Sequence, residues 1–182
     1  MVVPPLTPPL KADLRAAMRA ARLRQAAVPI VPPAPFLARL ARPGVIAAYL
    51  PIAGEADPAL LVDAAVARGW GLALPRIARR GAPMRFLDGN APREPGPMGL
   101  TQPVADAREL VPDLILTPLV AFDRCLNRLG QGAGFYDRAF ADHPQSLRIG
   151  VAWSIQRAEA VPTEPWDVPL HAVITEQGWI ER

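Results

Sequence analysis

A glycine-rich segment carries the clearest chemical signal in the sequence. Gly130, Gly132 and Gly134 stand at alternate positions between two arginines, Arg128 and Arg138. Glycine lets the backbone approach a ligand closely, and a helix that begins after such a turn directs N–H groups and a partial positive charge toward an anion. The segment therefore predicts a phosphate cradle. Its spacing matches neither the dinucleotide-binding G-x-G-x-x-G pattern nor a Walker A loop, and a ligand-free glycine turn is the alternative.

Two basic side chains near the start of the chain are candidates for contacts with the same anion. Lys11 and Arg15 are four residues apart, so on a helix they point in the same direction. Lys11 is the only lysine among 20 lysines and arginines. This indicates that the chain uses arginine for general positive charge and keeps one compact ammonium for a particular contact, such as a phosphate. The alternative is a solvated basic face, which Arg19 and Arg22 would extend.

Three carboxylates stand where they could act on a ligand. Asp137 follows the glycine segment, and carboxylate oxygens suit a hard cation such as Mg²⁺. Asp167 could be a second ligand of this cation, or an ordinary turn aspartate before the last strand. Glu55 follows a strand-like segment that ends at Leu50. Because α/β proteins bind ligands where strands end, Glu55 could accept hydrogen bonds from an aminopyrimidine edge, or it could be a solvated loop acid.

Composition excludes several other kinds of site. With two histidines and one cysteine, the chain cannot build a histidine-rich zinc site or an internal disulfide. Its only serines, Ser146 and Ser154, do not lie in a nucleophile elbow. The net charge is only +3, and no dense basic stripe of the kind that binds nucleic acid is present. Small polyanions such as nucleotide phosphates are therefore the expected partners.

The expected compartment is the cytoplasm. The first residues lack the basic region of a secretory signal, and a single cysteine fits a reducing environment. No segment is long and apolar enough to predict a membrane span. The longest basic cluster, Arg79-Arg80 near Arg76, is expected to be a solvated loop.

The elements that must position these residues alternate between strand and helix. The continuous apolar run at 114–120 is the strongest strand signal. The alternation predicts an α/β fold: a single three-layer domain over 1–182, with a central, largely parallel sheet flanked by helices. Strands are expected at 45–50, 70–74, 84–87, 114–120, 147–153 and 172–175, and helices from Thr7-Pro8 to about Gln25, at 36–40, from Asp57-Pro58 to about Gly69, and at 135–141.

Five segments occur in an order that resembles one known family. They are Lys11-Ala12-Asp13-Leu14-Arg15, Leu50 through Glu55, Arg128 through Arg138, Gly150-Val151-Ala152-Trp153 with Gln156, and Asp167-Val168-Pro169. The chain resembles the 5-formyltetrahydrofolate cyclo-ligases, also called 5,10-methenyltetrahydrofolate synthetases. The resemblance extends from Lys11 to about Glu176, and the glycine segment with Tyr136-Asp137-Arg138 is its most specific part.

The resemblance implies an enzyme that uses ATP and Mg²⁺ to close 5-formyltetrahydrofolate into 5,10-methenyltetrahydrofolate, releasing ADP and phosphate. It implies that Lys11 and Arg128 are catalytic and that Asp137 and Asp167 hold Mg²⁺. Leu50 and Glu55 are expected to contact the folate, while Tyr49, Tyr136 and Trp153 shape the pterin pocket. The residues expected to bind ATP are Lys11, Ala12, Asp13, Leu14, Arg15, Arg128, Leu129, Gly130, Gln131, Gly132, Ala133, Gly134, Phe135 and Tyr136.

The sequence departs from the family pattern at four positions. Trp166 stands where histidine is usual, His171 stands where a second aspartate is usual, and Gln102 replaces an acidic residue. Ala133 loosens the second glycine pair of the glycine segment. These departures concern the adenine or pterin side, and the phosphate and metal residues are intact.

Three other functions stay open from the sequence. The chain could be a non-catalytic relative that binds folate or nucleotide, although the pair of Asp137 and Asp167 favours an enzyme. It could be a sugar-phosphate isomerase or CoA-transferase-like enzyme on a similar scaffold, which would not need ATP. It could also be a protein whose basic helix docks a nucleic acid. The expected partner is the small-molecule folate, including its polyglutamylated forms, and the expected state is a monomer.

Overall fold

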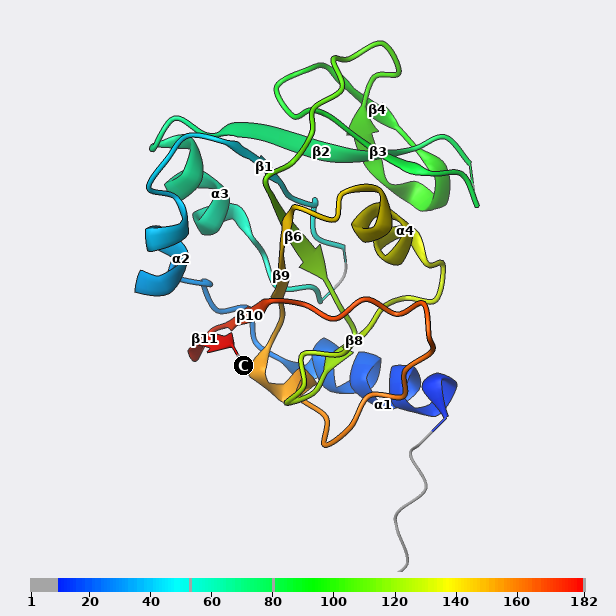
Figure 1. Ribbon diagram of the computed structural model, residues 1–182. Coiled ribbons are helices and arrows are strands. Elements are labelled where there is room, and N and C mark those ends of the chain that lie inside the picture. Colours follow the sequence, from blue (N-terminus) through cyan, green and yellow to red (C-terminus); the bar gives the residue numbers. More distant parts are fainter. Residues whose placement is uncertain (1–9, 53, 80, 182) are drawn as a thin grey trace, which may run out of the picture.

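The computed structural model describes residues 10–52, 54–79 and 81–181, and its centre is one seven-stranded sheet (Figure 1). The strands lie in the order β11-β10-β9-β6-β1-β2-β3. The inner pairs are parallel, whereas β11 and β3 run antiparallel to their neighbours at the two edges. The prediction of a largely parallel sheet is confirmed. The strand bounds are Val45–Ala47 for β1, Gly71–Ile77 for β2, Met84–Asp88 for β3, Leu114–Pro118 for β6, Leu147–Val151 for β9, Ala172–Thr175 for β10 and Gly178–Glu181 for β11.

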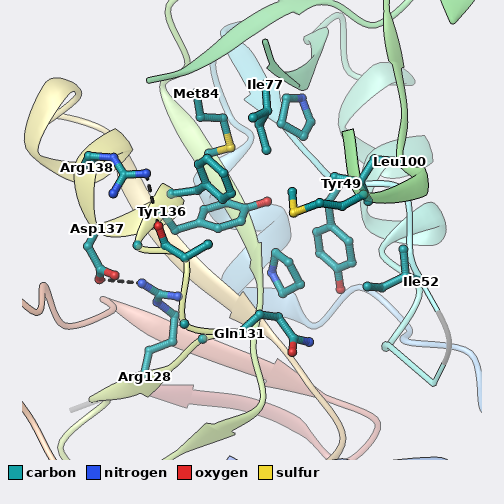
Figure 2. Close-up of a pocket in the computed structure, with 18 of the residues that line it drawn as sticks. Tyr49, Ile52, Ile77, Met84, Leu100, Arg128, Gln131, Tyr136, Asp137 and Arg138 are labelled. Atoms are coloured by element: carbon teal, nitrogen blue, oxygen red, sulfur yellow. Dashed lines mark hydrogen bonds and ion pairs between the residues drawn. The ribbon is translucent and has the colours of Figure 1, made fainter. Parts of the chain in front are cut away.

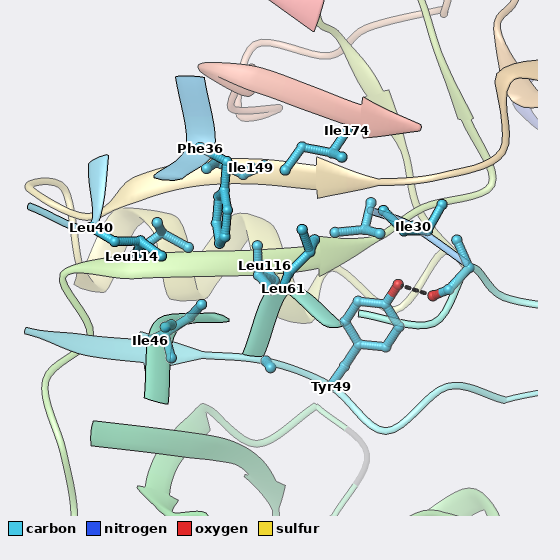
Figure 3. Packing of buried hydrophobic residues seen from close by; sticks show 14 of the residues in the cluster. Ile30, Phe36, Leu40, Ile46, Tyr49, Leu61, Leu114, Leu116, Ile149 and Ile174 are labelled. Atoms are coloured by element: carbon cyan, nitrogen blue, oxygen red, sulfur yellow. Dashed lines mark hydrogen bonds between the residues drawn. The ribbon is translucent and has the colours of Figure 1, made fainter. Parts of the chain in front are cut away.

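Helices cover both faces of the sheet because neighbouring residues of each buried strand point to opposite sides. On one face, Phe36 and Leu61 pack against Ile46 and Leu116 (Figure 3). On the other face, Phe140 belongs to a second buried cluster with residues of the same strands. The α-helices are α1 (Lys11–Arg24), α2 (Ala34–Arg39), α3 (Ala59–Val66) and α4 (Phe135–Asp142), and the short 3₁₀ helices are η1 (Pro97–Gly99) and η2 (Ser154–Gln156).

Three strands end earlier than the sequence predicts. β1 ends at Ala47 instead of Leu50, β6 at Pro118 instead of Val120, and β9 at Val151 instead of Trp153. The residues that follow each strand are still buried, so the apolar pattern continues after the ladder hydrogen bonds stop. Thr7 and Pro8, where the first helix is predicted to start, lie outside the described residues. Leu10 is described and is not helical, and α1 begins at Lys11, later than predicted.

Two small hairpins are not predicted by the sequence pattern, because strands of two or three residues have no detectable period. They are β4 (Arg93–Pro95) with β5 (Thr101–Pro103), and β7 (Ala121–Phe122) with β8 (Arg128–Leu129). Buried Asp123 holds the β7–β8 turn, since its carboxylate accepts hydrogen bonds from the backbone amides of Cys125, Asn127 and Val161. This hairpin leads directly into the glycine segment.

In the described part of the chain, no helix is both long enough and apolar enough to cross a bilayer.

Candidate active site

A cavity of about 860 Å³ opens beside the carboxyl ends of β1 and β6 (Figure 2). Leu50 follows β1, Pro118 ends β6, and both line the cavity. The other walls come from the start of α1, from β2 and β3, from the β4–β5 hairpin, and from the glycine segment with α4. Ligands of open α/β sheets bind at this end of the strands, so this position agrees with the prediction.

The glycine segment forms one end of the cavity. Gly132 has φ +102° and Gly134 has φ +67°, and α4 begins at the next residue, Phe135. The first backbone hydrogen bond of this turn of α4 runs from the Arg138 amide to the Gly134 carbonyl, 3.2 Å apart. The helix therefore does not use the amides that precede Arg138, and a helix start of this kind favours a bound anion.

Arg128 adds a nearly buried positive charge at this end. Its side chain is 4% exposed, and its Nη2 lies 2.6 Å from Oδ1 of Asp137. The guanidinium also lies near the rings of Tyr136 and Phe140. Its Nε is buried and has no hydrogen-bond partner. Because an unsatisfied buried donor is costly, this atom suits a site that an anionic ligand completes.

A second ion pair closes the same end from α1. Lys11 Nζ lies 2.6 Å from Oδ2 of Asp167, with side-chain exposures of 23% and 19%. The same oxygen accepts a hydrogen bond from the Glu164 amide at 2.7 Å. Lys11 and Asp167 both line the cavity, so the structure brings together two residues that are 156 positions apart in the sequence.

Two carboxylates therefore line the same cavity, each held by a basic side chain. Among the described residues, no group of three or more histidine, cysteine or acidic side chains could hold a metal alone. Mg²⁺ needs fewer protein ligands than that, because it is commonly held by one or two carboxylates together with substrate phosphates. Asp137 and Asp167 fit this mode of binding, since Oδ2 of Asp137 and Oδ1 of Asp167 accept no hydrogen bond from any described residue.

Arg15 contacts the glycine segment from α1. Its Nε donates to the Gly130 carbonyl at 2.9 Å, and it lines the cavity. One turn further along α1, Arg19 Nη2 donates to Oε1 of Gln131 at 2.6 Å. Arg15 and exposed Arg19 therefore both make specific contacts with the glycine segment.

A buried acidic side chain, Glu55, lines the cavity close to Gln131 of the glycine segment. Glu55 has a 6% exposed side chain and accepts a hydrogen bond from the Ile52 amide at 3.2 Å. Burial raises the pKa of Glu55, and Arg22 and the Ile52 amide oppose that rise. Burial and the nearby Glu55 charge also raise the pKa of the Tyr49 and Tyr136 hydroxyls. Both tyrosines therefore stay neutral near neutral pH, and the Tyr49 hydroxyl donates to the Ala56 carbonyl at 2.5 Å.

The rest of the cavity is apolar. Ile77, Met84 and Leu100 face the two tyrosines in Figure 2. Such a wall suits a flat ring system whose edges meet a few polar groups. These three residues are not predicted from the sequence, because they come from β2, β3 and the end of the η1 loop and form no local motif. Their pattern in the sequence is that of ordinary core strands.

The cavity includes most of the residues that the resemblance assigns, with clear exceptions. Ala12, Asp13 and Leu14 do not line it, and Leu14 packs with Ala121 and Leu129 in a separate buried cluster. Trp153 does not line it either: its ring is in the core, and its Nε1 donates to the Gly54 carbonyl. The assigned residues that do line the cavity are Lys11, Arg15, Tyr49, Leu50, Glu55, the whole of Arg128 to Tyr136, Asp137 and Asp167.

The positions that depart from the family pattern have separate roles in the structure. Gln102 is buried, and its Oε1 accepts a hydrogen bond from the Ile77 amide at 3.0 Å, so it supports the cavity wall. Trp166 lines the cavity and is 69% exposed. His171 lies outside the cavity, where its ring contacts Arg148.

Comparisons with known proteins agree with this arrangement. The model of the 5-formyltetrahydrofolate cyclo-ligase family matches residues 8–176. A 5-formyltetrahydrofolate cyclo-ligase of Escherichia coli K12 is 34% identical over 139 residues, which cover 71% of this chain and 76% of that relative. The cyclo-ligase of Haemophilus influenzae is 37% identical over 97 residues, and the match spans about half of each protein, 50% of this chain and 51% of that relative.

Two solved structures have the same fold. The Aquifex aeolicus 5,10-methenyltetrahydrofolate synthetase superposes with a TM-score of 0.71 at 27% identity, covering 95% of this chain and 93% of that one. The Mycoplasma pneumoniae 5,10-methenyltetrahydrofolate synthetase gives a TM-score of 0.69 at 22% identity, covering 92% and 99%. The second likeness supports the fold alone.

Proposed function

The chain belongs to the 5-formyltetrahydrofolate cyclo-ligase family, and from this premise we propose that it converts 5-formyltetrahydrofolate into 5,10-methenyltetrahydrofolate with ATP and Mg²⁺. One observation carries the proposal: a single cavity joins a cationic, glycine-lined end to an apolar wall that holds a buried acid. The first end suits phosphates, and the second suits a pterin ring with polar edges.

The reaction needs such a joined site because a formyl oxygen is a poor leaving group. The formyl oxygen attacks the γ-phosphorus of ATP, the bond from that phosphorus to the bridging oxygen breaks, and ADP leaves. N10 of the folate then attacks the activated formyl carbon. The carbon–oxygen bond breaks, phosphate departs with the formyl oxygen, and N10 gives up its proton. The protein's task in phosphoryl transfer is positioning and charge stabilisation rather than covalent catalysis.

We assign the nucleotide side to Lys11, Arg128 and the backbone amides of the glycine segment. Lys11 and Arg128 are the two cations that reach this end of the cavity as members of ion pairs. Both would share their charge with the transferring phosphoryl group, which is why we call them catalytic. Arg15 contributes through the Gly130 carbonyl, which it holds in place.

Mg²⁺ would be held by Asp137 and Asp167 together with ATP phosphates. When bound, it neutralises phosphate charge and favours departure of ADP. The two aspartates keep their orientation through Arg128 and Lys11.

On the folate side, we assign Leu50 and Glu55 to the substrate, with Tyr49 and Tyr136 beside them. Glu55 can accept hydrogen bonds from the amino and N–H groups of a pterin edge. Leu50 and the apolar wall supply a surface for the ring. The assigned residues run from Lys11 to Asp167 and line one cavity, which supports the proposal of a single domain.

A spectroscopic assay tests the proposal. Protein is mixed with 5-formyltetrahydrofolate and Mg·ATP, and the absorbance of 5,10-methenyltetrahydrofolate is followed while ADP is measured separately. We expect product and ADP in equal amounts, and no product when any one component is omitted. Folate binding without turnover would indicate a non-catalytic relative. Turnover of a sugar phosphate or a CoA ester without ATP would indicate the other enzyme classes, and either result would reject the proposal.

A further inference from the structure

We infer that Arg22 is a positioning residue for folate binding: from α1 it holds Glu55 as a carboxylate in the cavity wall. The inference rests on the proposed function, in which Glu55 contacts the folate. Arg22 does not line the cavity, so it acts through Glu55 and not on the substrate directly.

The first support is the burial of both partners. The side chains of Arg22 and Glu55 are 7% and 6% exposed, and Arg22 Nη1 lies 3.5 Å from Glu55 Oε1. Arginine is almost never buried this completely unless it is paired. A buried ion pair that loses one member leaves the other charge uncompensated. Removal of Arg22 therefore acts directly on the charge of Glu55.

The second support is the fit between Arg22 and the loop that carries Glu55. Gly54 precedes Glu55 and has φ +75°, and a Cβ atom placed on it would lie 3.5 Å from Cγ and Nε of Arg22. The arginine stem therefore lies against the backbone of this loop. Arg22 fixes the position of Glu55 through this contact as well as through its charge.

The third support is that different residues of α1 contact different parts of the site. Arg15 and Arg19 donate to Gly130 and Gln131 of the glycine segment. Arg22, one turn further, contacts Glu55 in the folate wall. Because the nucleotide end has its own two contacts, loss of Arg22 should disturb folate binding far more than ATP binding.

The charge of Glu55 depends on a small set of neighbours. Burial favours its neutral form and raises its pKa, whereas the Ile52 amide, Arg22 and Gln131 favour the ionised form. The tyrosines that face it, Tyr49 and Tyr136, are neutral near pH 7, and Asp57 adds a further negative charge near Tyr49. Without Arg22, the positive charge in this set is lost, and Glu55 takes up a proton at a higher pH.

The experiment compares Arg22→Gln with the wild-type enzyme. KM for 5-formyltetrahydrofolate, KM for ATP and kcat are measured from roughly pH 5 to 8, where a carboxyl with a raised pKa titrates. We expect the acidic limb of kcat/KM for the folate to move upward by about one pH unit or more, the shift that loss of an adjacent opposite charge produces. KM for ATP should change little. Arg22→Lys keeps the charge and should restore much of the wild-type profile.

Two further variants complete the test. Arg24→Gln removes an exposed positive charge from the same helix and should leave both KM values and the pH profile unchanged. Glu55→Gln removes the titrating group and should abolish the acidic limb. This variant keeps the inference open to rejection even if Arg22→Gln fails to fold. An unmoved limb in Arg22→Gln, an equal rise in both KM values, or a persistent limb in Glu55→Gln would overturn the inference. An inactive wild-type protein would instead reject the proposed function itself.

Discussion

Four charged residues of the proposed nucleotide end form two ion pairs. Lys11 meets Asp167 and Arg128 meets Asp137, each at 2.6 Å. These pairs keep four charges in place without a buried, uncompensated ion. A triphosphate with Mg²⁺ offers each member a new partner of the right sign, since the cations can turn to phosphate oxygens and the carboxylates to the metal. The two ion pairs can therefore exchange their partners for those of the ligand.

Lys11 gives the first prediction at the residue scale. Lys11→Ala should lower kcat by about 10²–10³-fold, the usual effect of removing one group tuned to a developing charge. The free energy of unfolding should change by less than about 1 kcal/mol, because the Lys11–Asp167 pair is partly exposed and such pairs contribute little. Steady-state kinetics and thermal unfolding check the two parts. Lys11→Arg should also be impaired, because a planar guanidinium does not replace a compact ammonium; full activity in either variant would remove Lys11 from the mechanism.

The residue types of the nucleotide end could be predicted from the sequence, but their contacts could not. Glycine spacing and a lone lysine indicated a phosphate site because both are unusual in themselves. Arg22 gave no such signal, since a helical arginine among several others is normally solvated. Its burial depends on a loop more than 30 positions away, which is information that only the folded chain contains.

At the scale of elements, the site is built where α1 meets the glycine segment and where that segment becomes α4. The sequence predicted both helices because they are long enough to show a period of 3.6 residues and because glycine precedes α4. It did not predict β7 and β8, which have two residues each. Arg128 nevertheless lies in this hairpin, so the position of a proposed catalytic residue depends on an element that is too short to predict.

Gly132 gives the prediction at this scale. Its φ of +102° is a backbone conformation that an L-residue rarely adopts. Gly132→Ala should therefore reshape the glycine segment and raise KM for ATP by about tenfold or more, in line with a strain of roughly 1–3 kcal/mol. Gly69→Ala is the matched control, because Gly69 has φ +82° and open space around it but lies outside the cavity. Equal KM values for ATP in wild type and Gly132→Ala would show that the amides of this turn do not bind the nucleotide.

The contact between Arg148 in β9 and His171, just before β10, gives a second prediction, on how stability depends on pH. The Arg148 amide donates to Nδ1 of His171 at 2.9 Å, and Arg148 Nη2 lies 3.0 Å from Nε2. If the His171 ring were doubly protonated, both of its N–H groups would point at N–H donors of Arg148, which disfavours the protonated form. Burial and the charges of Arg148 and Arg39 accordingly lower the pKa of His171 below its ordinary 6.5.

The sign of the effect follows from proton uptake. Below about pH 6.5, the unfolded chain protonates His171 before the folded chain does, so stability falls as pH falls toward the lowered pKa of the folded state. We expect Tm to drop over this interval, and to drop less in His171→Asn. His143→Asn is the control: it leaves the contact between His171 and Arg148 intact, so its Tm should follow pH as in the wild type. A wild-type slope in His171→Asn would assign the pH dependence to other groups.

At the scale of the whole molecule, the parallel centre of the sheet places the ends of β1 and β6 side by side, and the cavity forms there. The sequence could predict this centre because buried parallel strands are continuous apolar runs. It could not predict that β3 and β11 return antiparallel, because an apolar pattern has no direction. The β2–β3 return matters for function, since Ile77 and Met84 at its end form the apolar wall.

A site shared between α1, the glycine segment and the β2–β3 wall should link ligand binding to the stability of the whole fold. A ligand present at 100 times its Kd adds about 2.7 kcal/mol to the free energy of unfolding. For a chain of this length, this raises Tm by roughly 5–11 °C. We expect Mg²⁺ with a non-hydrolysable ATP analogue to give such a shift, and 5-formyltetrahydrofolate to give its own. Lys11→Ala should lose most of the nucleotide shift while keeping the folate shift, and Glu55→Gln should do the reverse. If either variant lost both shifts equally, the two ends of the cavity would not be the separate binding regions that the arrangement of the cavity implies.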